Sequence, residues 1–209
     1  MSPTRPIRLH RFALSGHAHR AQLMLSLLGV PHELVDVDLA GGAQRTPDFL
    51  ALNPLGQVPV IQDGDTVVAD SNAILVYLAL TRDPHRRWLP EDALAQAKVQ
   101  RWLSAAAGPL AFGAASARVA HLFGRPLNPH SITLAQQLLD VTERHLDGRE
   151  WLAASHPTIA DVAMYSYTAH APEGGIPLEP WPRTRAWLRR FEGLPGFVAM
   201  ARSPVPSSS

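Results

Sequence analysis

The sequence predicts a two-part fold, an α/β half of about 80 residues followed by an all-helical half. Three observations support this prediction. Strand-like alternation of apolar and polar residues occurs only in the first part of the chain. Helix-like spacing of apolar residues continues to about residue 191. Between the two parts, the segment 82–89, which contains Pro84, is predicted to be a linker.

The first half alternates strands with helices. Gly29-Val30-Pro31 ends the first helix, and Thr46-Pro47-Asp48 is a typical helix start. Asp63-Gly64 predicts a hairpin between the last two strands. The expected elements are strands at 7–12, 33–37, 57–62 and 66–68, and helices at 18–28, 49–52 and 71–80. This order predicts a small sheet with both parallel and antiparallel strands.

The second half is predicted to be entirely helical. Gly108-Pro109 should kink or end its first helix. Thr158 and Asp161 have the spacing of a capping box, a purely structural device. The expected helices are 91–107 with a continuation at 118–123, then 129–146, 158–170 and 183–191, and the tail 203–209 is expected to fray. We therefore expect domains at residues 1–82 and 90–209.

Composition narrows the possible functions. Nineteen Lys and Arg residues against eighteen Asp and Glu leave a net charge of +1, so neither nucleic acid nor a membrane is an expected partner. The chain contains no cysteine, which excludes disulfides, thiolate zinc sites and cysteine nucleophiles. The longest charge-free segment, 102–117, is too short to span a bilayer, and residues 1–11 show no export signal. We expect a soluble, cytoplasmic protein.

Several catalytic motifs are missing from the sequence. It has no phosphate-binding P-loop, no dinucleotide-binding glycine motif, no HExxH zinc motif and no GxSxG hydrolase motif. His17 and His19 are two residues apart near a helix start, so their side chains diverge and no metal site is expected.

Ser15 stands where the first strand gives way to the first helix. Its hydroxyl would lie beside the unpaired N–H groups and the partial positive charge of the helix start, which suits an anionic ligand. The alternative is a plain N-cap worth about 1 kcal/mol, the usual role of a serine at this position.

Two further segments have the character of a binding site. The loop 53–60 contains two prolines and a glycine, and Val58 should be extended because it precedes Pro59. Ser71 opens the helix 71–80 and offers a hydroxyl and N–H groups to a carboxylate, while Asp70 suits an ammonium group. These are the two charges of an amino acid, although an N-cap is again the simpler alternative.

Together these segments resemble the soluble, cytosolic glutathione S-transferases. The segment 12–20 (FALSGHAHR) is similar to the active-site turn of serine-type classes such as phi and theta, and 42–59 to the second helix and the cis-proline loop. The segment 70–74 (DSNAI) resembles the γ-glutamyl site, and 158–161 (TIAD) the helix-capping box of the second domain. The resemblance covers both halves in order, and it implies a thioredoxin-like domain (βαβαββα) followed by an all-helical domain.

The resemblance implies roles for residues of the glutathione site. Ser15 would donate a hydrogen bond to the glutathione sulfur, and Val58, before a cis Pro59, would pair its backbone with the cysteinyl unit. Asp70 and Ser71 would hold the γ-glutamyl end.

The resemblance also implies residues around this centre. Gln57 would lie alongside the γ-glutamyl end. Gln44 and Arg45 stand where the family often has a His-Lys pair for the glycyl carboxylate; Arg45 keeps the charge and Gln44 departs from the pattern. The electrophile pocket would lie between the domains, near Gly108-Pro109. Candidates to line it, each equally consistent with ordinary core or surface, are Phe12, His17, Phe112 and Phe123.

The free energy needed to stabilise a glutathione thiolate can be supplied by Ser15 and the start of the first helix. A free thiol with a pKa of about 8.5 is only a few per cent ionised at neutral pH, and lowering that pKa by roughly two units requires about 2.7 kcal/mol. A hydrogen bond to a charged group supplies about 1.5–3 kcal/mol, and a helix N-terminus about 0.3–1 kcal/mol. Ser15 is therefore better interpreted as a donor to a thiolate than as a nucleophile, because the sequence positions no base for it.

The resemblance implies a homodimeric enzyme that conjugates glutathione, as co-substrate and without a metal, to small hydrophobic electrophiles in detoxification. A glutathione-dependent isomerase, dehalogenase or peroxidase is an alternative on the same fold. A non-catalytic binding or scaffold protein is a further alternative, because a fold does not guarantee an activity.

Overall fold

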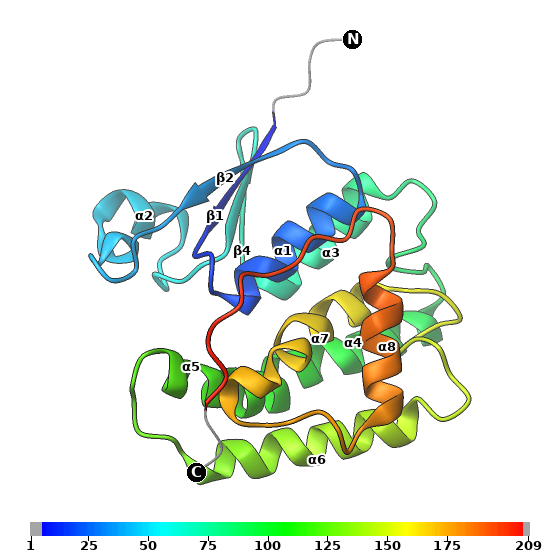
Figure 1. Ribbon diagram of the computed structural model, residues 1–209. Coiled ribbons are helices and arrows are strands. Elements are labelled where there is room, and N and C mark those ends of the chain that lie inside the picture. Colours follow the sequence, from blue (N-terminus) through cyan, green and yellow to red (C-terminus); the bar gives the residue numbers. More distant parts are fainter. Residues whose placement is uncertain (1–5, 207–209) are drawn as a thin grey trace.

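The computed structural model describes residues 6–206 of the chain. A sheet and three α-helices form the N-terminal half, and further helices form the C-terminal half (Figure 1). The strands are β1 (Ile7–Arg11), β2 (His32–Asp36), β3 (Val60–Asp63) and β4 (Thr66–Ala69). The α-helices are α1 (Gly16–Leu27), α2 (Pro47–Leu52), α3 (Ser71–Arg82), α4 (Ala93–Ala105), α5 (Ser116–Leu122), α6 (Pro129–His145), α7 (Ile159–Ala169) and α8 (Pro182–Glu192). Short 3₁₀ turns at Ala43–Arg45 and Ala171–Gly174 were not predicted.

The sheet is mixed and has the strand order β2-β1-β3-β4. Strand β1 pairs in parallel with β2 and antiparallel with β3, and β3 and β4 form the predicted hairpin. Leu9 lies opposite Leu34 on one side and Ile61 on the other. With its helices, this is the predicted thioredoxin-like arrangement, and the all-helical second half is confirmed as well.

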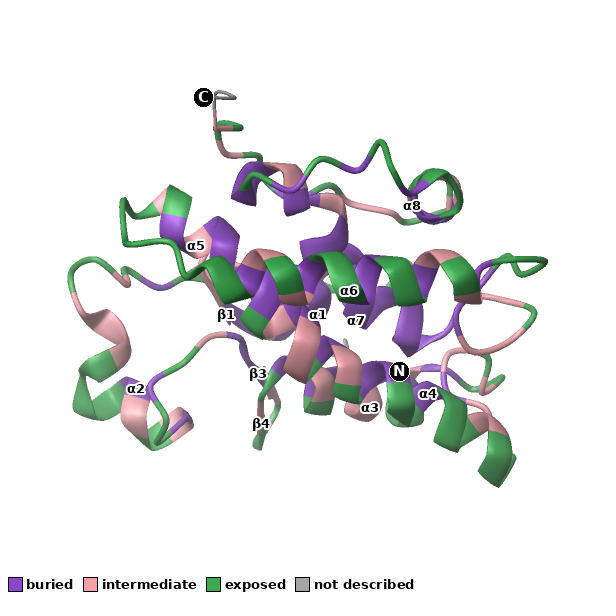
Figure 2. Ribbon diagram, turned by 90° about the horizontal axis from the view of Figure 1, so that it is seen from below, coloured by how far each residue is buried: buried purple, intermediate pink, exposed green. Residues whose placement is uncertain are grey.

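Helices α1 and α3 lie side by side between the sheet and the helical half, where both contact α7 (Figure 1). Buried residues are concentrated in α7 and in the elements around it (Figure 2). Leu9 of the sheet, Met24 of α1 and Val162 of α7 belong to one hydrophobic core. Burial of this shared core stabilises the contact between the two halves.

The predicted strand 57–62 begins only at Val60. Pro59 has no N–H to donate to a neighbouring strand. The preceding loop is also held by Asn53, whose Nδ2 donates to the Gln57 carbonyl (2.8 Å) and whose Oδ1 accepts from the Leu55 N–H (3.1 Å). Residues 57–59 therefore stay outside the sheet.

The helix does not end at Gly108-Pro109, where we expected a kink or an end. Helix α4 continues into a π-helical segment, Ala106–Ala115, which leads directly into α5. Pro109 falls where i→i+5 hydrogen bonding has replaced the α-helical pattern that a proline disrupts. Gly113 allows close packing here, because a Cβ on it would lie 2.9 Å from the Ala135 nitrogen of α6.

The C-terminal segment crosses back over α1, as the red trace in Figure 1 shows. The Val198 carbonyl lies 2.9 Å from His19 Nε2 of α1. The Ser203 hydroxyl donates to the buried Glu173, so the tail is held at Ser203, where we expected fraying. Residues 207–209 of that predicted tail lie outside the described residues. Within residues 6–206, no helix is both long and apolar enough to cross a lipid bilayer.

Candidate functional site

A cavity of about 500 Å³ gathers most of the residues predicted to form the site. In the sheet register, His10 of β1 lies opposite Val60, and Val60 lies opposite Ala69 of β4. The turn after β1, the loop before β3 and the turn after β4 therefore meet at one edge of the sheet. The cavity is lined by Ser15, His17, Leu39, Gln44, Asn53, Leu55, Gly56, Gln57, Val58, Pro59, Ala69, Asp70 and Ser71.

Ser15 is the N-cap of α1 and is partly buried. Its Oγ accepts a hydrogen bond from the Ala18 N–H (3.2 Å). Among the described residues its O–H has no hydrogen-bond acceptor. Ser15 therefore caps the helix and still has a donor for a group in the cavity, so the two interpretations of this serine are compatible.

Val58 presents its peptide group to the same cavity. The Val58–Pro59 bond is cis. Neither the N–H nor the carbonyl of Val58 is hydrogen-bonded to another group in residues 6–206. Both are available to an extended ligand, which would pair with them as a neighbouring strand does.

Asp70 and Ser71 lie at the start of α3. Asp70 Oδ1 accepts from the N–H groups of Asn72 and Ala73 (both 2.9 Å). Asp70 has φ 76°, a conformation unusual for a residue with a side chain, and such backbone strain is concentrated at functional sites. Its exposed carboxylate retains Oδ2, which has no hydrogen-bond partner in the described part of the chain, for a cationic group.

Sequence reasoning gave no role to Arg20, which lies directly behind Ser71. Its side chain is fully buried, and its Nη1 donates to Ser71 Oγ (3.2 Å) and lies 3.0 Å from His17 Nδ1. The available signal was a charged residue four positions before Met24 on the apolar side of α1.

The pKa values of His17 and Arg20 define the charges beside Ser71. Burial lowers the pKa of His17 to about 3, and the nearby Arg20 guanidinium adds to the effect. Burial also lowers the pKa of Arg20 to about 10, which leaves it protonated at neutral pH. His17 is therefore neutral and Arg20 is cationic.

The remaining predicted residues lie around the cavity. Gln44 lines it, with its Nε2 3.4 Å from the Leu39 carbonyl. Gln57 also lines it and has an exposed side chain. Arg45 is exposed and does not line the cavity, although its Cδ would lie 3.6 Å from a Cβ on Gly56.

Comparison with known proteins now assigns the family. Residues 14–81 match the glutathione S-transferase N-terminal domain, and residues 127–195 match the glutathione S-transferase C-terminal domain. Glutathione S-transferase 3 of Zea mays is 33% identical over 98% of this chain and 99% of its own. This chain belongs to the glutathione S-transferase family.

Solved structures agree with this assignment. A possible glutathione S-transferase from Rhodopseudomonas palustris is 35% identical, with a TM-score of 0.85 over 96% of this chain and 100% of its own. A glutathione transferase homologue from Drosophila mojavensis, solved with bound glutathione, is 25% identical, with a TM-score of 0.83 over 91% and 89% of the two chains.

Two of the residues predicted to line the electrophile pocket of this glutathione S-transferase contact each other. The rings of Phe12 and Phe123 stack with their centroids 6.5 Å apart, and Phe123 is 50% exposed. The Phe12 carbonyl accepts from the Ser15 N–H (2.9 Å), so this aromatic pair lies beside the site turn. Phe112 is 69% exposed and does not line the 500 Å³ cavity. His17 does line that cavity.

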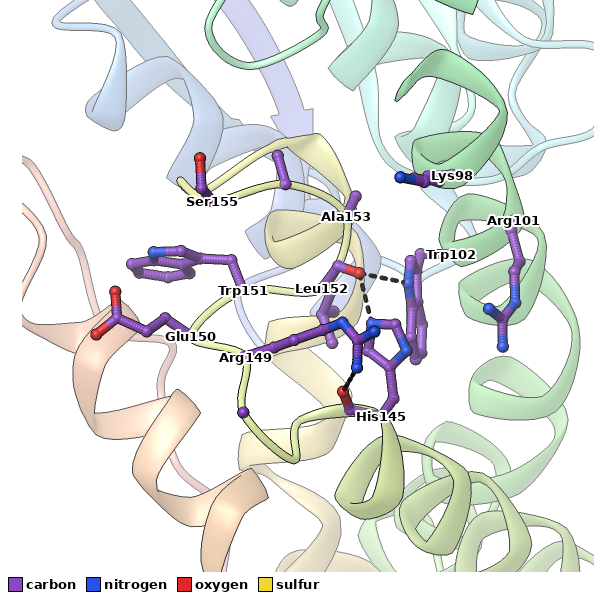
Figure 3. Close-up of a pocket in the computed structure, with 12 residues that line it drawn as sticks. Lys98, Arg101, Trp102, His145, Arg149, Glu150, Trp151, Leu152, Ala153 and Ser155 are labelled. Carbon is purple, nitrogen blue, oxygen red and sulfur yellow. Dashed lines mark hydrogen bonds between the residues drawn. The ribbon is translucent and has the colours of Figure 1, made fainter. Parts of the chain in front are cut away.

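A larger cavity of about 690 Å³ lies elsewhere in this glutathione S-transferase, between α4, the end of α6 and the loop 148–155 (Figure 3). Trp102 Nε1 lies 2.9 Å and His145 Nε2 lies 2.7 Å from the carbonyl of Leu152, one of the residues that line this cavity (Figure 3). None of the residues predicted for the site lines this cavity. The smaller cavity is therefore the candidate site, because the available hydroxyl and peptide groups are there.

Proposed function

We propose that glutathione binds in the 500 Å³ cavity and that the protein conjugates it to small hydrophobic electrophiles as a serine-type transferase. The proposal rests on Ser15, whose Oγ already accepts a hydrogen bond from Ala18 and whose O–H remains a donor. A donor without a base beside it stabilises an anion and does not itself attack. The bound glutathione in the Drosophila mojavensis homologue supports this choice of ligand.

Each part of glutathione has a complementary group in the cavity. The cysteinyl unit pairs with the peptide group of Val58, which places its sulfur near Ser15. The ammonium and the carboxylate of the γ-glutamyl end take Asp70 and Ser71, with Gln57 alongside. The glycyl carboxylate takes Gln44 and Arg45 at the rim.

The thiolate is stabilised by the Ser15 O–H and by the N–H groups at the start of α1. Together these groups supply roughly the 2.7 kcal/mol that a two-unit decrease of the thiol pKa requires. The electrophile approaches from the side of Phe12 and Phe123, where an exposed aromatic surface adjoins the site turn.

We extend the proposal to a cytoplasmic homodimer that acts in detoxification, with domains at residues 1–82 and 90–209. The family resemblance supports these features. Light scattering on the purified protein tests the homodimer, which predicts twice the mass of the 22.7 kDa chain.

The decisive experiment compares the wild type with Ser15→Ala. Calorimetry should show glutathione binding to both, whereas turnover of 1-chloro-2,4-dinitrobenzene should fall roughly 10- to 100-fold in the variant. The pKa of the bound thiol, followed by thiolate absorbance, should rise in parallel. Unchanged turnover would show that Ser15 does not stabilise the thiolate.

Assays of the purified wild-type protein with three other substrates distinguish the alternative activities. Dichloromethane reports a dehalogenase, cumene hydroperoxide a peroxidase and maleylacetoacetate an isomerase. Absence of glutathione binding at millimolar concentration would favour a scaffold protein over all of these enzymes.

A further inference from the structure

Three basic side chains line the 690 Å³ cavity (Figure 3). Lys98 and Arg101 lie on one face of α4, and Arg149 follows α6. No carboxylate lies within 4.0 Å of any of the three among residues 6–206. The lining also contains Glu150, but its carboxylate lies 3.9 Å from Arg190 Nε. The whole chain has a net charge of only +1, so this cavity concentrates positive charge.

Both guanidinium groups of the cavity are held in place by neighbouring residues. The Arg101 guanidinium lies over the Trp102 ring, 5.4 Å from the centroid. Arg149 Nη1 donates to the His145 carbonyl (3.0 Å), and the Arg149 side chain extends toward the His145 ring (Figure 3). The rings of Trp102 and His145 contact each other, with centroids 4.9 Å apart. The two guanidinium groups therefore lie beside the same pair of rings, and an anion bound there gains two cations that are already ordered.

Uncharged groups of the cavity add to its capacity for hydrogen bonds. The main-chain N–H groups of Ala153, Ala154 and Ser155 have no acceptor in the described part of the chain. His145 Nε2 donates to the Leu152 carbonyl (2.7 Å), because a carbonyl only accepts. Burial lowers the pKa of His145, so the ring is neutral and its Nδ1 is an acceptor. The cavity thus offers cations and N–H donors to an anion, and an acceptor to a hydroxyl group.

We infer that this cavity binds a small hydroxylated phosphate monoester. A phosphate monoester has three acceptor oxygens that point in different directions and a charge of about −2, so it can contact Arg101 on one wall and Arg149 on the other. A carboxylate has only two such oxygens, in one plane, and a single charge. Cavities for small organic ligands measure about 300–1,000 Å³, so 690 Å³ leaves room for the organic group. The inference is independent of the proposed function, because this cavity shares no lining residue with the glutathione cavity.

Calorimetry on the purified protein at low ionic strength tests the inference with a matched set of ligands. Glucose 6-phosphate, glucose and glucuronate carry a phosphate, a hydroxyl and a carboxylate on the same carbon. Glucose 6-phosphate should bind with a Kd below about 1 mM, and the other two should bind at least about tenfold more weakly. AMP compared with adenosine repeats the test on a different organic group.

Substitutions locate the binding in this cavity. Arg101→Gln and Arg149→Gln should each weaken the binding of glucose 6-phosphate about tenfold, because each removes a charged donor to the phosphate. Lys98→Gln should weaken it by about two- to threefold, because lysine acts as a flexible point charge. Arg185→Gln is the matched control, since it removes the same charge from an exposed arginine of α8 outside the cavity, and it should leave the Kd unchanged. Thermal unfolding verifies that all four variants are folded.

The results separate the outcomes clearly. Binding of one of the two phosphates supports the inference and identifies the organic group, whereas binding of neither at millimolar concentration overturns it. Glucuronate that binds as tightly as glucose 6-phosphate, or a Kd unchanged in both Arg101→Gln and Arg149→Gln, also overturns it. Glutathione affinity should be the same in all variants, so a failure of the proposed function is observed independently of this site.

Discussion

Arg118 Nη1 donates a hydrogen bond of 2.6 Å to the carbonyl oxygen of Leu14, the residue directly before Ser15. Arg118 belongs to α5, so a side chain of the helical half holds the site turn of the N-terminal half. Its Nε binds Glu173, which also contacts His170 Nδ1 (2.5 Å) and accepts from the Ser203 hydroxyl. The position of Ser15 therefore depends on a buried ion pair in the other half of the chain.

Arg118→Met should destabilise the protein strongly. It leaves the Glu173 carboxylate buried without its cation, a change that costs about 3–5 kcal/mol in comparable cases. Urea unfolding measures the loss, and the double variant Arg118→Met/Glu173→Gln should recover part of it. Equal stability of the wild type and Arg118→Met would contradict the role of this ion pair.

Ser15→Asp should separate the structural role of Ser15 from its chemical role. Aspartate caps a helix about as well as serine, so the free energy of unfolding should change by less than about 0.5 kcal/mol. A second negative charge beside the glutathione sulfur should raise the thiol pKa and nearly abolish conjugation. Thermal unfolding and turnover measure the two effects, and an active Ser15→Asp variant would refute a thiolate at this place.

Phe123→Ala should weaken use of the electrophile without affecting glutathione. The change removes half of the aromatic pair with Phe12 and none of the groups that line the glutathione cavity. We expect a KM for 1-chloro-2,4-dinitrobenzene about tenfold higher, with the Kd for glutathione unchanged. Leu94→Ala, an exposed apolar residue at the start of α4, is the control. A Phe123→Ala variant with the KM of the wild type would place the electrophile elsewhere.

Asp161→Asn should impair folding and leave the chemistry intact. The Asp161 carboxylate is fully buried and accepts from Thr158 N (2.9 Å), Leu152 N (3.0 Å) and Trp187 Nε1 (3.0 Å). An amide turns one acceptor into a donor that faces these donors, so we expect a loss of about 3 kcal/mol or more. Asp147→Asn, which breaks only an exposed ion pair with Arg183, should cost at most about 1 kcal/mol. Urea unfolding compares the two, and glutathione affinity should be unchanged in both.

Stability should decrease on acidification below pH 6.5. Burial, as the largest cause, lowers the pKa of His17 to about 3 and that of His19 to about 4. In the unfolded chain both histidines take up protons near pH 6.5, whereas in the folded chain they stay neutral until pH 4 or below. Each therefore contributes stability that is present above pH 6.5 and is lost at about 1.4 kcal/mol per pH unit as the pH falls toward the folded value.

Thermal unfolding between pH 7.5 and 4.5 measures this dependence. His19→Gln should remove about half of the part of the slope that His17 and His19 contribute, because these are the two described histidines whose pKa is lowered to about 4 or below. A slope equal to that of the wild type would show that His19 is not held neutral in the folded protein.

The sequence predicted most elements because their signals are local. Thr46 caps α2, Asp63-Gly64 forms the β3–β4 turn, and Thr158 and Asp161 form a capping box, all within a few residues. The helix continues through Gly108-Pro109, where we expected a kink or an end, because packing of the π-helical segment against α6 outweighs local preference.

Local sequence signals also predicted only part of the candidate site. Cap and loop patterns pointed to Ser15 and to Asp70-Ser71, but only the resemblance and the sheet register bring them together. Arg20 was not predicted, because its contacts are made with residues that only the folded chain brings next to it. The path from Ser203 through Glu173 and Arg118 to Leu14 joins residues whose proximity no local pattern predicts.

That path has a consequence for biosynthesis. Leu14 leaves the ribosome well before Ser203, because the whole helical half lies between them in the sequence. The sheet and its helices can form on the nascent chain, because their pairing partners all lie within residues 7–82. The last anchor of the turn before Ser15 arrives only after the helical half has been synthesised, so the nascent chain can form its sheet before its site turn is fully held.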